Sequence, residues 1–184
     1  MDVHTAIEAR RAFRSLDPVP IAEDLIRDLA GHAQLAPSCS NNQPWRFVFV
    51  HDPAVLAAMR PAFSPGNEWC YAASMIVAVF SRKEDDCVIK DREYDQFDTG
   101  MAVGFLILRA TELGLVAHPI GGFSPKKTRE ILGIPDGFRV ETLILVGKHA
   151  SGISPVLSEK QAAQETVRPE RLPRERCVFF NRYA

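Results

Sequence analysis

The chain has 184 residues, of which 46% are hydrophobic and 24% are charged, and its formal net charge is -1. This length fits one domain with a sizeable core, and the near-neutral charge excludes an overall attraction to nucleic acid or to an anionic membrane. No apolar run is long enough to span a bilayer and no signal peptide is visible, so we expect a cytoplasmic protein.

Four cysteines are spread along the chain, at Cys39, Cys70, Cys87 and Cys177. None of them forms a CxxC pair, and no group of cysteines and histidines has zinc-finger spacing. We therefore expect reduced thiols and no metal site. Cys39 has no identifiable base near it in the sequence, which disfavours a role as a nucleophile.

The first predicted elements are two helices that flank a basic segment. Residues 3–10 form a short helix with an apolar stripe. In the basic segment, residues 10–14, three of five residues are arginine. Guanidinium groups match phosphate oxygens and are always charged, although so short a cluster is also typical of a solvated face. The second helix is predicted to begin at Pro20 and to end at Pro37.

A polar loop at residues 37–45 connects this second helix to a strand at residues 46–50. It contains two prolines, two serines, two asparagines and one glutamine. The loop therefore offers many hydrogen-bond donors and acceptors without formal charge. Such a loop can bind the edge of a flat heterocycle, whereas an ordinary polar turn can have the same composition.

The middle of the chain contains a buried strand, a charged segment and a long helix. Asp52 is the expected N-cap of a short helix. Residues 75–80 are continuously apolar, as in a buried strand. Residues 81–96 carry charges of both signs, which is typical of a solvated segment. The helix predicted at residues 98–114 is apolar on nearly every side, so it should be buried in a core or between subunits.

The C-terminal third begins with a short strand at residues 115–118 and a loop at residues 119–123. Its two adjacent glycines allow a close approach of the backbone to a ligand, although a glycine turn alone is a weak signal. Ser124 and Pro125 should begin the next helix, which Gly133 ends.

The last predicted strand covers residues 138–147, and a polar tail follows at residues 148–176 with little periodicity. The tail ends in the apolar stretch Cys177–Phe180. These side chains are too apolar to be left in water, so we expect the tail to dock on a surface.

Three motifs together resemble the FMN-dependent nitroreductase family, from about Ile7 to Gly147. The first is the Pro-Ser-x-x-Asn-x-Gln-Pro-Trp loop at residues 37–45. The second is Asp-Thr-Gly-Met-Ala at residues 98–102, and the third is the double-glycine loop. The basic segment is similar to the family's Arg-Arg-Ser-x-Arg, with Ala12 in place of the usual serine, so one hydroxyl hydrogen bond is missing.

The resemblance implies an α+β fold, a nitroreductase-like three-layer sandwich with a central, mostly antiparallel sheet flanked by helices and a long C-terminal arm. Residues 1–184 would form a single FMN-binding domain, whose arm, residues 148–184, docks on the partner in a homodimer. Each FMN would lie at the subunit interface. The basic segment, Asn67 and the glycine loop would come from one chain, and the loop at residues 37–43 from the other.

The resemblance also implies a set of site residues. Tyr94 and Phe97 are candidates for the substrate pocket. Lys148 and Arg168 are alternatives to Arg171 for completing the phosphate site. The implied FMN-binding residues are Arg10, Arg11, Ala12, Arg14, Pro37, Ser38, Cys39, Ser40, Asn41, Gln43, Asn67, Pro119, Ile120, Gly121, Gly122 and Arg171.

No catalytic side chain is implied, because flavin N5 carries the chemistry and a backbone N–H of the Gly121–Gly122 loop supports it. Many relatives carry glutamate where this chain has Gly121. The implied reaction is ping-pong hydride transfer from NADH or NADPH through the flavin to a small electron-poor acceptor, such as a nitroaromatic or a quinone. The sequence distinguishes neither the two donors nor the acceptors.

Three other readings stay open at this stage. The same scaffold also carries other flavin chemistry, including dehydrogenation, dehalogenation and fragmentation of the flavin. A second reading is a non-catalytic protein that binds or senses FMN. The third is a flavin-free protein that binds a phosphorylated metabolite or is simply a structural dimer.

Overall fold

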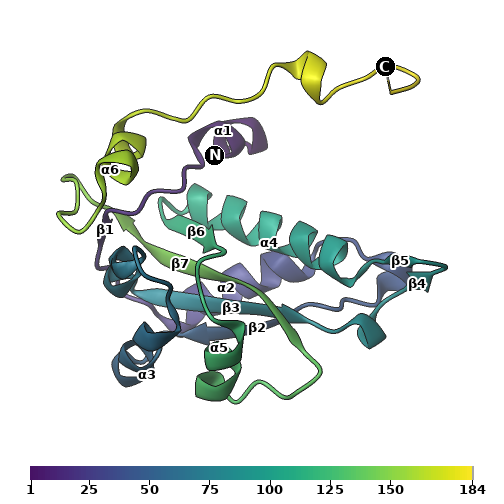
Figure 1. Cartoon of the computed structure of the whole chain (residues 1–184), viewed down its shortest axis with the longest axis horizontal. Coiled ribbons are helices and arrows are strands. Elements are labelled where there is room, and N and C mark those ends of the chain that lie inside the picture. Colours follow the sequence, from purple (N-terminus) through teal and green to yellow (C-terminus); the bar gives the residue numbers. More distant parts are fainter. Residues whose placement is uncertain (184) are drawn as a thin grey trace.

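A five-stranded antiparallel sheet lies at the centre of the computed structural model, which describes residues 1–183 (Figure 1). The longest strand, β7, pairs with β3, with β6 and, at its C-terminal end, with β1. β2 pairs with the free edge of β3. The strands are β1 (Leu16–Asp17), β2 (Arg46–Val50), β3 (Met75–Ser81), β6 (Val116–Ile120) and β7 (Arg139–His149).

Helices cover both faces of this sheet, which gives the predicted three-layer α+β fold. One face packs against α2 and α4, and the other packs against the layer that contains α3 and α5. The α-helices of the described chain are α1 (Val3–Ala9), α2 (Glu23–Gln34), α3 (Pro53–Ala58), α4 (Asp95–Glu112), α5 (Pro125–Leu132) and α6 (Glu159–Thr166).

Residues 75–80 of β3 are continuously apolar because both faces of the strand are covered. Successive side chains of a strand point to opposite faces of the sheet. Val77 and Val79 pack in the core beneath α2 and α4, while Ile76 and Ala78 pack in the core on the other face. All four side chains are buried. The alternation explains why residues 75–80 of this strand are all apolar.

Several predicted boundaries are confirmed. β2 has the predicted bounds. Ser124 caps α5 by accepting a hydrogen bond from the Lys127 N–H, and Gly133 ends that helix with φ at 65°. Helix α2, however, begins at Glu23 and not at Pro20, because the backbone up to Ala22 is extended.

Helix α4 begins at Asp95, one turn before the predicted start at Asp98. The carboxylate of Asp95 is buried and accepts hydrogen bonds from Ser81 Oγ at 2.8 Å and from Arg139 at 2.7 Å. These contacts with β3 and β7 hold the additional turn in the helix. They join residues far apart in the sequence, so the local pattern could not show them.

The sequence did not predict strand β1, the hairpin of β4 (Val88–Ile89) and β5 (Arg92–Glu93), or helix α6. Helix α6 lies in the tail that showed little periodicity. It begins with a capping box, in which the Ser158 and Gln161 side chains bond each other's backbone N–H. The Ser-x-x-Gln spacing was a usable signal for this helix.

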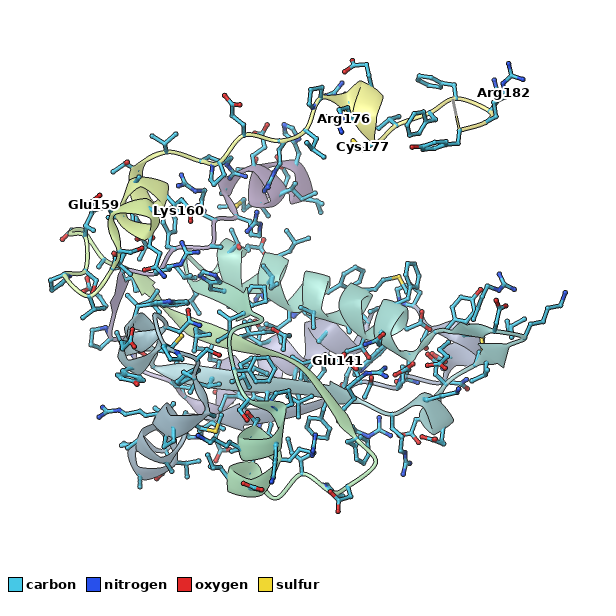
Figure 2. All side chains as sticks on the ribbon, in the orientation of Figure 1. Glu141, Glu159, Lys160, Arg176, Cys177 and Arg182 are labelled. Carbon is cyan, nitrogen blue, oxygen red and sulfur yellow. A yellow bond between two sulfur atoms is a disulfide. The ribbon has the colours of Figure 1, made fainter. Side chains whose placement is uncertain are left out.

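The arm is shorter than the predicted residues 148–184, because β7 extends to His149 and α6 ends at Thr166. Residues 167–183 form the arm, which runs past α1 and away from the sheet (Figure 1). Figure 2 shows Arg176, Cys177 and Arg182 on this arm. Its tip is apolar and exposed: Phe180 is 85% exposed and Tyr183 is 86% exposed. In residues 1–183, no helix has both the length and the hydropathy needed to cross a bilayer.

Candidate functional site

Five arginines line one pocket on the side of the molecule that carries α1 and α6. The pocket has a volume of about 310 Å³. Of the three residues considered for completing the phosphate site, Arg168 and Arg171 line it. Lys148 pairs with Asp17 in the β7–β1 ladder and is not part of the lining. The lining residues are Arg10, Arg11, Ala12, Arg14, Gln164, Arg168, Pro169 and Arg171.

Helix α6 shapes this pocket because it accepts hydrogen bonds from the basic segment. Gln164 accepts from Arg11 through its backbone oxygen at 2.7 Å and from Arg14 through its side-chain oxygen at 2.9 Å. The buried Glu165 carboxylate accepts the backbone N–H groups of Arg14 at 2.9 Å and Ser15 at 3.0 Å. These two residues of α6 were missed from the sequence together with the helix that carries them.

The charge of this pocket is not neutralised by the protein. Within residues 1–183, none of its five arginines forms a salt bridge with an aspartate or glutamate. Burial lowers the pKa of Arg10, and the charges of Arg168, Arg171 and Arg11 lower it further. Guanidinium groups that crowd together without acidic partners are suited to binding a multiply charged anion, such as a phosphate.

Asn67 ties the turn before the 3-10 helix Glu68–Ala72 to the glycine loop. Its Nδ2 donates to the Gly122 oxygen at 3.0 Å, and its Oδ1 accepts from Trp69 Nε1 at 3.2 Å. A Cβ built on Gly122 would lie 2.2 Å from Asn67 Nδ2, so this close approach requires glycine. A Cβ on Gly121 would meet nothing within 4 Å.

The N–H groups of the glycine loop are available to a ligand. In residues 1–183, neither the turn and loop hydrogen bonds nor the side-chain hydrogen bonds use the N–H of Gly121 or Gly122. Pro119 and Ile120 were predicted in this loop but form the end of β6. Ile120 is held there by its ladder pairing with Leu143, a contact across 23 residues that the sequence pattern did not show.

The arginine pocket and the Asn67–Gly122 contact are close neighbours. The Arg14 guanidinium lies 5.9 Å from the centre of the Trp69 ring, and the Trp69 and His118 ring centres are 4.7 Å apart. Gln161 of α6 donates to the Gly66 oxygen, next to Asn67, at 3.1 Å. The structure thus brings the basic segment, Asn67 and the glycine loop together on one side of the molecule.

His118 makes the stability of this region sensitive to pH. Burial lowers the pKa of His118 to about 4, although the side chain donates a hydrogen bond to the Phe13 oxygen at 2.9 Å. Between pH 6.5 and 4 the unfolded chain therefore binds a proton that the folded chain does not. The contribution of neutral His118 to the free energy of unfolding is fully present above pH 6.5. It decreases as the pH drops and is about 2 kcal/mol smaller at pH 5.

The measurement is urea unfolding at pH 8 and pH 5, for the wild type and for His118→Asn. The asparagine can still donate to Phe13 but does not titrate, so we expect the variant to lose about 2 kcal/mol less stability between the two pH values. His4→Asn, at an exposed histidine on α1, is the control and should behave as the wild type. Equal pH dependence in the wild type and His118→Asn would show that His118 is not responsible.

The polar loop is joined to the segment before β4 by Cys39 and Cys87, and Figure 1 shows β4 and β5 at the end of α4 away from α6, whose residues contact the basic segment. The Cys39 N–H donates to Asp98 in the first turn of α4 at 2.6 Å, whereas the Met1 amino group pairs with Glu112 at its end. Helix α4 has 18 residues and spans about 27 Å. Within one chain, the loop at residues 37–43 therefore does not reach the arginines.

Tyr94 and Phe97 lie at the same end of α4 as the polar loop. Tyr94 directly precedes α4, and Phe97 in its first turn is 64% exposed. The predicted site residues thus form two groups at the two ends of α4. A site that contains both groups has to be built from two chains.

The polar loop has a fixed shape. Ser40, Asn41 and Gln43 adopt left-handed backbone, with φ at 50°, 59° and 52°, which is uncommon for residues other than glycine. Inside the loop, the Gln43 N–H donates to Ser38 Oγ at 3.0 Å. Cys39 fixes the loop from outside, because it forms a disulfide with Cys87, 48 residues away.

This disulfide shows that the prediction of four reduced thiols was wrong for two of them. Cys39 and Cys87 are far apart in the sequence, and only the fold brings their Cα atoms to 5.9 Å. Cys70 is a buried free thiol whose pKa is raised by burial to about 12, so it stays neutral. Cys177 is a free thiol on the exposed arm.

A sequence model of the Nitroreductase family matches residues 7–68 and 65–148. The match covers more than half of the chain and includes the basic segment, the polar loop and the glycine loop. The chain belongs to the nitroreductase family. The predicted family and fold class are therefore confirmed.

Known proteins similar to this nitroreductase-family chain match it over most of their length. It is 26% identical to the NADH dehydrogenase of Thermus thermophilus, over 98% of this chain and 96% of that protein. It is 28% identical to the iodotyrosine deiodinase of Haliscomenobacter hydrossis, over 85% of this chain and 84% of that protein. A solved structure of an oxidoreductase containing FMN superposes with a TM-score of 0.82 at 29% identity. The match covers 100% of this chain and 93% of that chain.

Proposed function

We propose that this protein is an FMN-dependent oxidoreductase that transfers hydride from NADH or NADPH to a small electron-poor acceptor, such as a nitroaromatic or a quinone. The observation that carries the proposal is the pocket of five arginines without acidic partners, next to the Asn67–Gly122 contact. The similarity to an NADH dehydrogenase and to an oxidoreductase containing FMN supports it.

The residues on this side of the molecule fit the chemistry of FMN. The arginine pocket would hold the phosphate, and the charges of Arg168, Arg171 and Arg11 all act on Arg10 there. Arg14, stacked over Trp69, extends the positive charge from the pocket toward Asn67. The free N–H groups of Gly121 and Gly122 would donate to the ring. When bound, FMN takes up hydride from the nicotinamide and passes reducing equivalents to the acceptor.

The protein's own groups would bind and orient, without a side chain that transfers a proton. Glu165 fixes the backbone of the basic segment, and Asn67 fixes the glycine loop, so both sets of donors are held before a ligand arrives. Gly121 carries no side chain, and its surroundings leave space where a glutamate would stand in many relatives. This space would admit a bulkier acceptor.

We infer that the site is completed by a second copy of the chain. An apolar pocket lies beside α4, where Phe105 is 42% exposed, and neighbouring side chains such as Val3 and Leu35 are 70% and 73% exposed. An exposed apolar surface of this kind is typical of a subunit interface. In the proposed homodimer, the polar loop, Tyr94 and Phe97 of one subunit would lie over the arginine pocket of the other, and each arm would dock on the partner.

Phe105→Glu tests this arrangement, because it places a charge in the proposed interface. We expect the variant to be a monomer that binds FMN at least about 10-fold more weakly, a loss of about 1.4 kcal/mol, since the partner's loop no longer contributes. Analytical ultracentrifugation and FMN titration are the measurements. Val88→Glu, at a similarly exposed apolar residue on β4, is the control. A Phe105→Glu monomer that binds FMN normally would contradict the shared site.

The reaction itself is tested by steady-state kinetics with NADH and NADPH against a nitroaromatic and a quinone. We expect stoichiometric oxidation of one of the two nucleotides and parallel double-reciprocal lines, as in a ping-pong mechanism. A second candidate function is reductive dehalogenation, favoured by the 28% identity to an iodotyrosine deiodinase. Iodide release from iodotyrosine, with no turnover of nitroaromatics or quinones, would select that function instead.

A further inference from the structure

A group of metal-ligating side chains lies at the β4–β5 end of α4, away from the arginine pocket. The sulfur atoms of Cys39 and Cys87 and a carboxylate oxygen of Asp86 all lie within 4.8 Å of one another. Cys39 belongs to the polar loop, whereas Asp86 and Cys87 belong to the charged segment at residues 81–96. The cluster therefore connects two segments that are separate in the sequence.

One oxygen of Asp86 faces another carboxyl group and no N–H or hydroxyl donor. Its Oδ1 accepts from the Cys87 N–H at 2.8 Å and from Asn42 Nδ2 at 3.3 Å. Its Oδ2 is buried and has no hydrogen-bond partner among residues 1–183. The carboxylate of Asp98, itself 2% exposed, lies beside it. Two carboxyl groups that face each other in this way repel when both are charged, and a cation at this point would remove the repulsion.

We propose that the reduced form of this cluster binds one divalent metal ion of the zinc type. The two thiolates and the Asp86 carboxylate would be three ligands, and a water molecule would be the fourth. Zn²⁺ takes such mixed sulfur and oxygen sets, at about 2.3 Å from sulfur and about 2.0–2.2 Å from oxygen. The Asp98 carboxylate accepts the Cys39 N–H at 2.6 Å, which holds Cys39 in place. It would also add negative charge next to the ion.

The disulfide and the metal ion exclude each other, because each sulfur bonds either to the other sulfur or to the metal. An external dithiol would deliver two electrons and two protons to the disulfide and would itself be oxidised to a disulfide. Metal binding would then release the two thiol protons. The polar loop would stay linked to residues 81–96 in both states. The disulfide would link them in the oxidised state, and the metal ion would link them in the reduced state.

Without either fastening, few contacts hold these two segments together. Asn42 Nδ2 reaches Asp86 at 3.3 Å and Cys87 Sγ at 3.5 Å, and Arg46, which directly follows the loop, lies 3.4 Å from Asp85. Such exposed contacts contribute little to stability. A reduced cluster without metal would leave the Asp86 and Asp98 carboxylates side by side, so the ion is expected to order this end of α4.

The test is a Co²⁺ titration of the full-length protein, since Co²⁺ is a coloured substitute for Zn²⁺. The protein is freed of metal, and one sample is reduced with a phosphine while the other is kept oxidised. We expect the reduced sample to bind one Co²⁺ per chain with a thiolate-to-metal absorption band, which Zn²⁺ removes, and the oxidised sample to show no band. Difference spectra against the Zn²⁺ form cancel any flavin absorption.

Variants then assign the ligands. Cys87→Ser should abolish the band, and Asp86→Asn should weaken Co²⁺ binding at least about 10-fold, as for loss of one ligand. Asp91→Asn, at an exposed carboxylate between β4 and β5, and Cys177→Ser, on the arm, should leave binding unchanged. The absence of a band in the reduced wild type would overturn the proposal, and so would a band that survives in Cys39→Ser/Cys87→Ser. Neither readout requires FMN, so the proposed function and the metal site can fail separately.

Discussion

Arg10→Glu is expected to weaken FMN binding by about 100-fold, or about 3 kcal/mol, which is the largest effect of a single substitution on the cofactor. The change removes a charge-assisted donor and places a carboxylate next to the phosphate. Arg10 is chosen because it lines the pocket and because the charges of three other arginines act on it. Fluorescence titration of the flavin-free protein with FMN measures the affinity.

The stability of the flavin-free protein separates a binding role from a structural one. In the wild type, the charge of Arg10 is repelled by its neighbours, so Arg10→Glu relieves this repulsion and should not lower the free energy of unfolding without FMN. With FMN in excess, the wild type should become more stable than the variant. Arg27→Glu, at an exposed arginine on α2, is the control for a change of charge alone. Equal loss of stability with and without FMN would mean that Arg10 merely supports the fold.

Gly122→Ala is expected to lower the free energy of unfolding by about 3 kcal/mol, because its Cβ would lie 2.2 Å from Asn67 Nδ2. The added methyl would also break the hydrogen bond from Asn67 to the Gly122 oxygen. Gly121→Ala is the matched control, since a Cβ there meets nothing within 4 Å and the change should stay within about 0.5 kcal/mol. Urea unfolding of the flavin-free proteins provides both values.

The contact between Gly122 and Asn67 can be tested further with a double variant. Asn67→Ala removes the side chain that the new methyl would strike. Gly122→Ala should therefore cost about 1–2 kcal/mol less in the Asn67→Ala background than in the wild type. If the two substitutions are additive, or if Gly121→Ala is as harmful as Gly122→Ala, then close packing against Asn67 is not the reason for glycine at position 122.

Local sequence signals predicted the elements whose cause is local. The β-branched and aromatic residues of 46–50 gave β2 its bounds, and the Ser-Pro start and the glycine end gave α5 its bounds. The apolar run at residues 75–80 predicted a buried strand, and β3 has both faces covered. The family resemblance added the antiparallel sheet, which periodicity alone does not predict.

Features that depend on contacts between distant residues were not predicted. The additional turn of α4 exists because Asp95 binds Ser81 and Arg139. The disulfide joins Cys39 to Cys87 across 48 residues. Neither contact leaves a spacing pattern in the sequence.

The residues of the candidate site also fall into those that the sequence predicted and those that only the fold reveals. The arginines of the basic segment were recognised because their side-chain chemistry is visible in the sequence. Gln164 and Glu165 were missed, since their importance comes from where α6 packs. The choice between Lys148, Arg168 and Arg171 also required the fold, which places both arginines in the pocket lining and Lys148 in the β7–β1 ladder. Their role in binding FMN stays a prediction.

The most direct measurement is the absorbance spectrum of the purified protein, recorded without oxygen before and after addition of NADH and, separately, NADPH. We expect flavin bands that bleach with at least one of the two nucleotides, which would also identify the donor. Flavin bands that persist with both nucleotides would indicate a protein that binds FMN without this reaction. A colourless protein that takes up no FMN when it is supplied would contradict the central claim, that the arginine pocket and the glycine loop together form a flavin site.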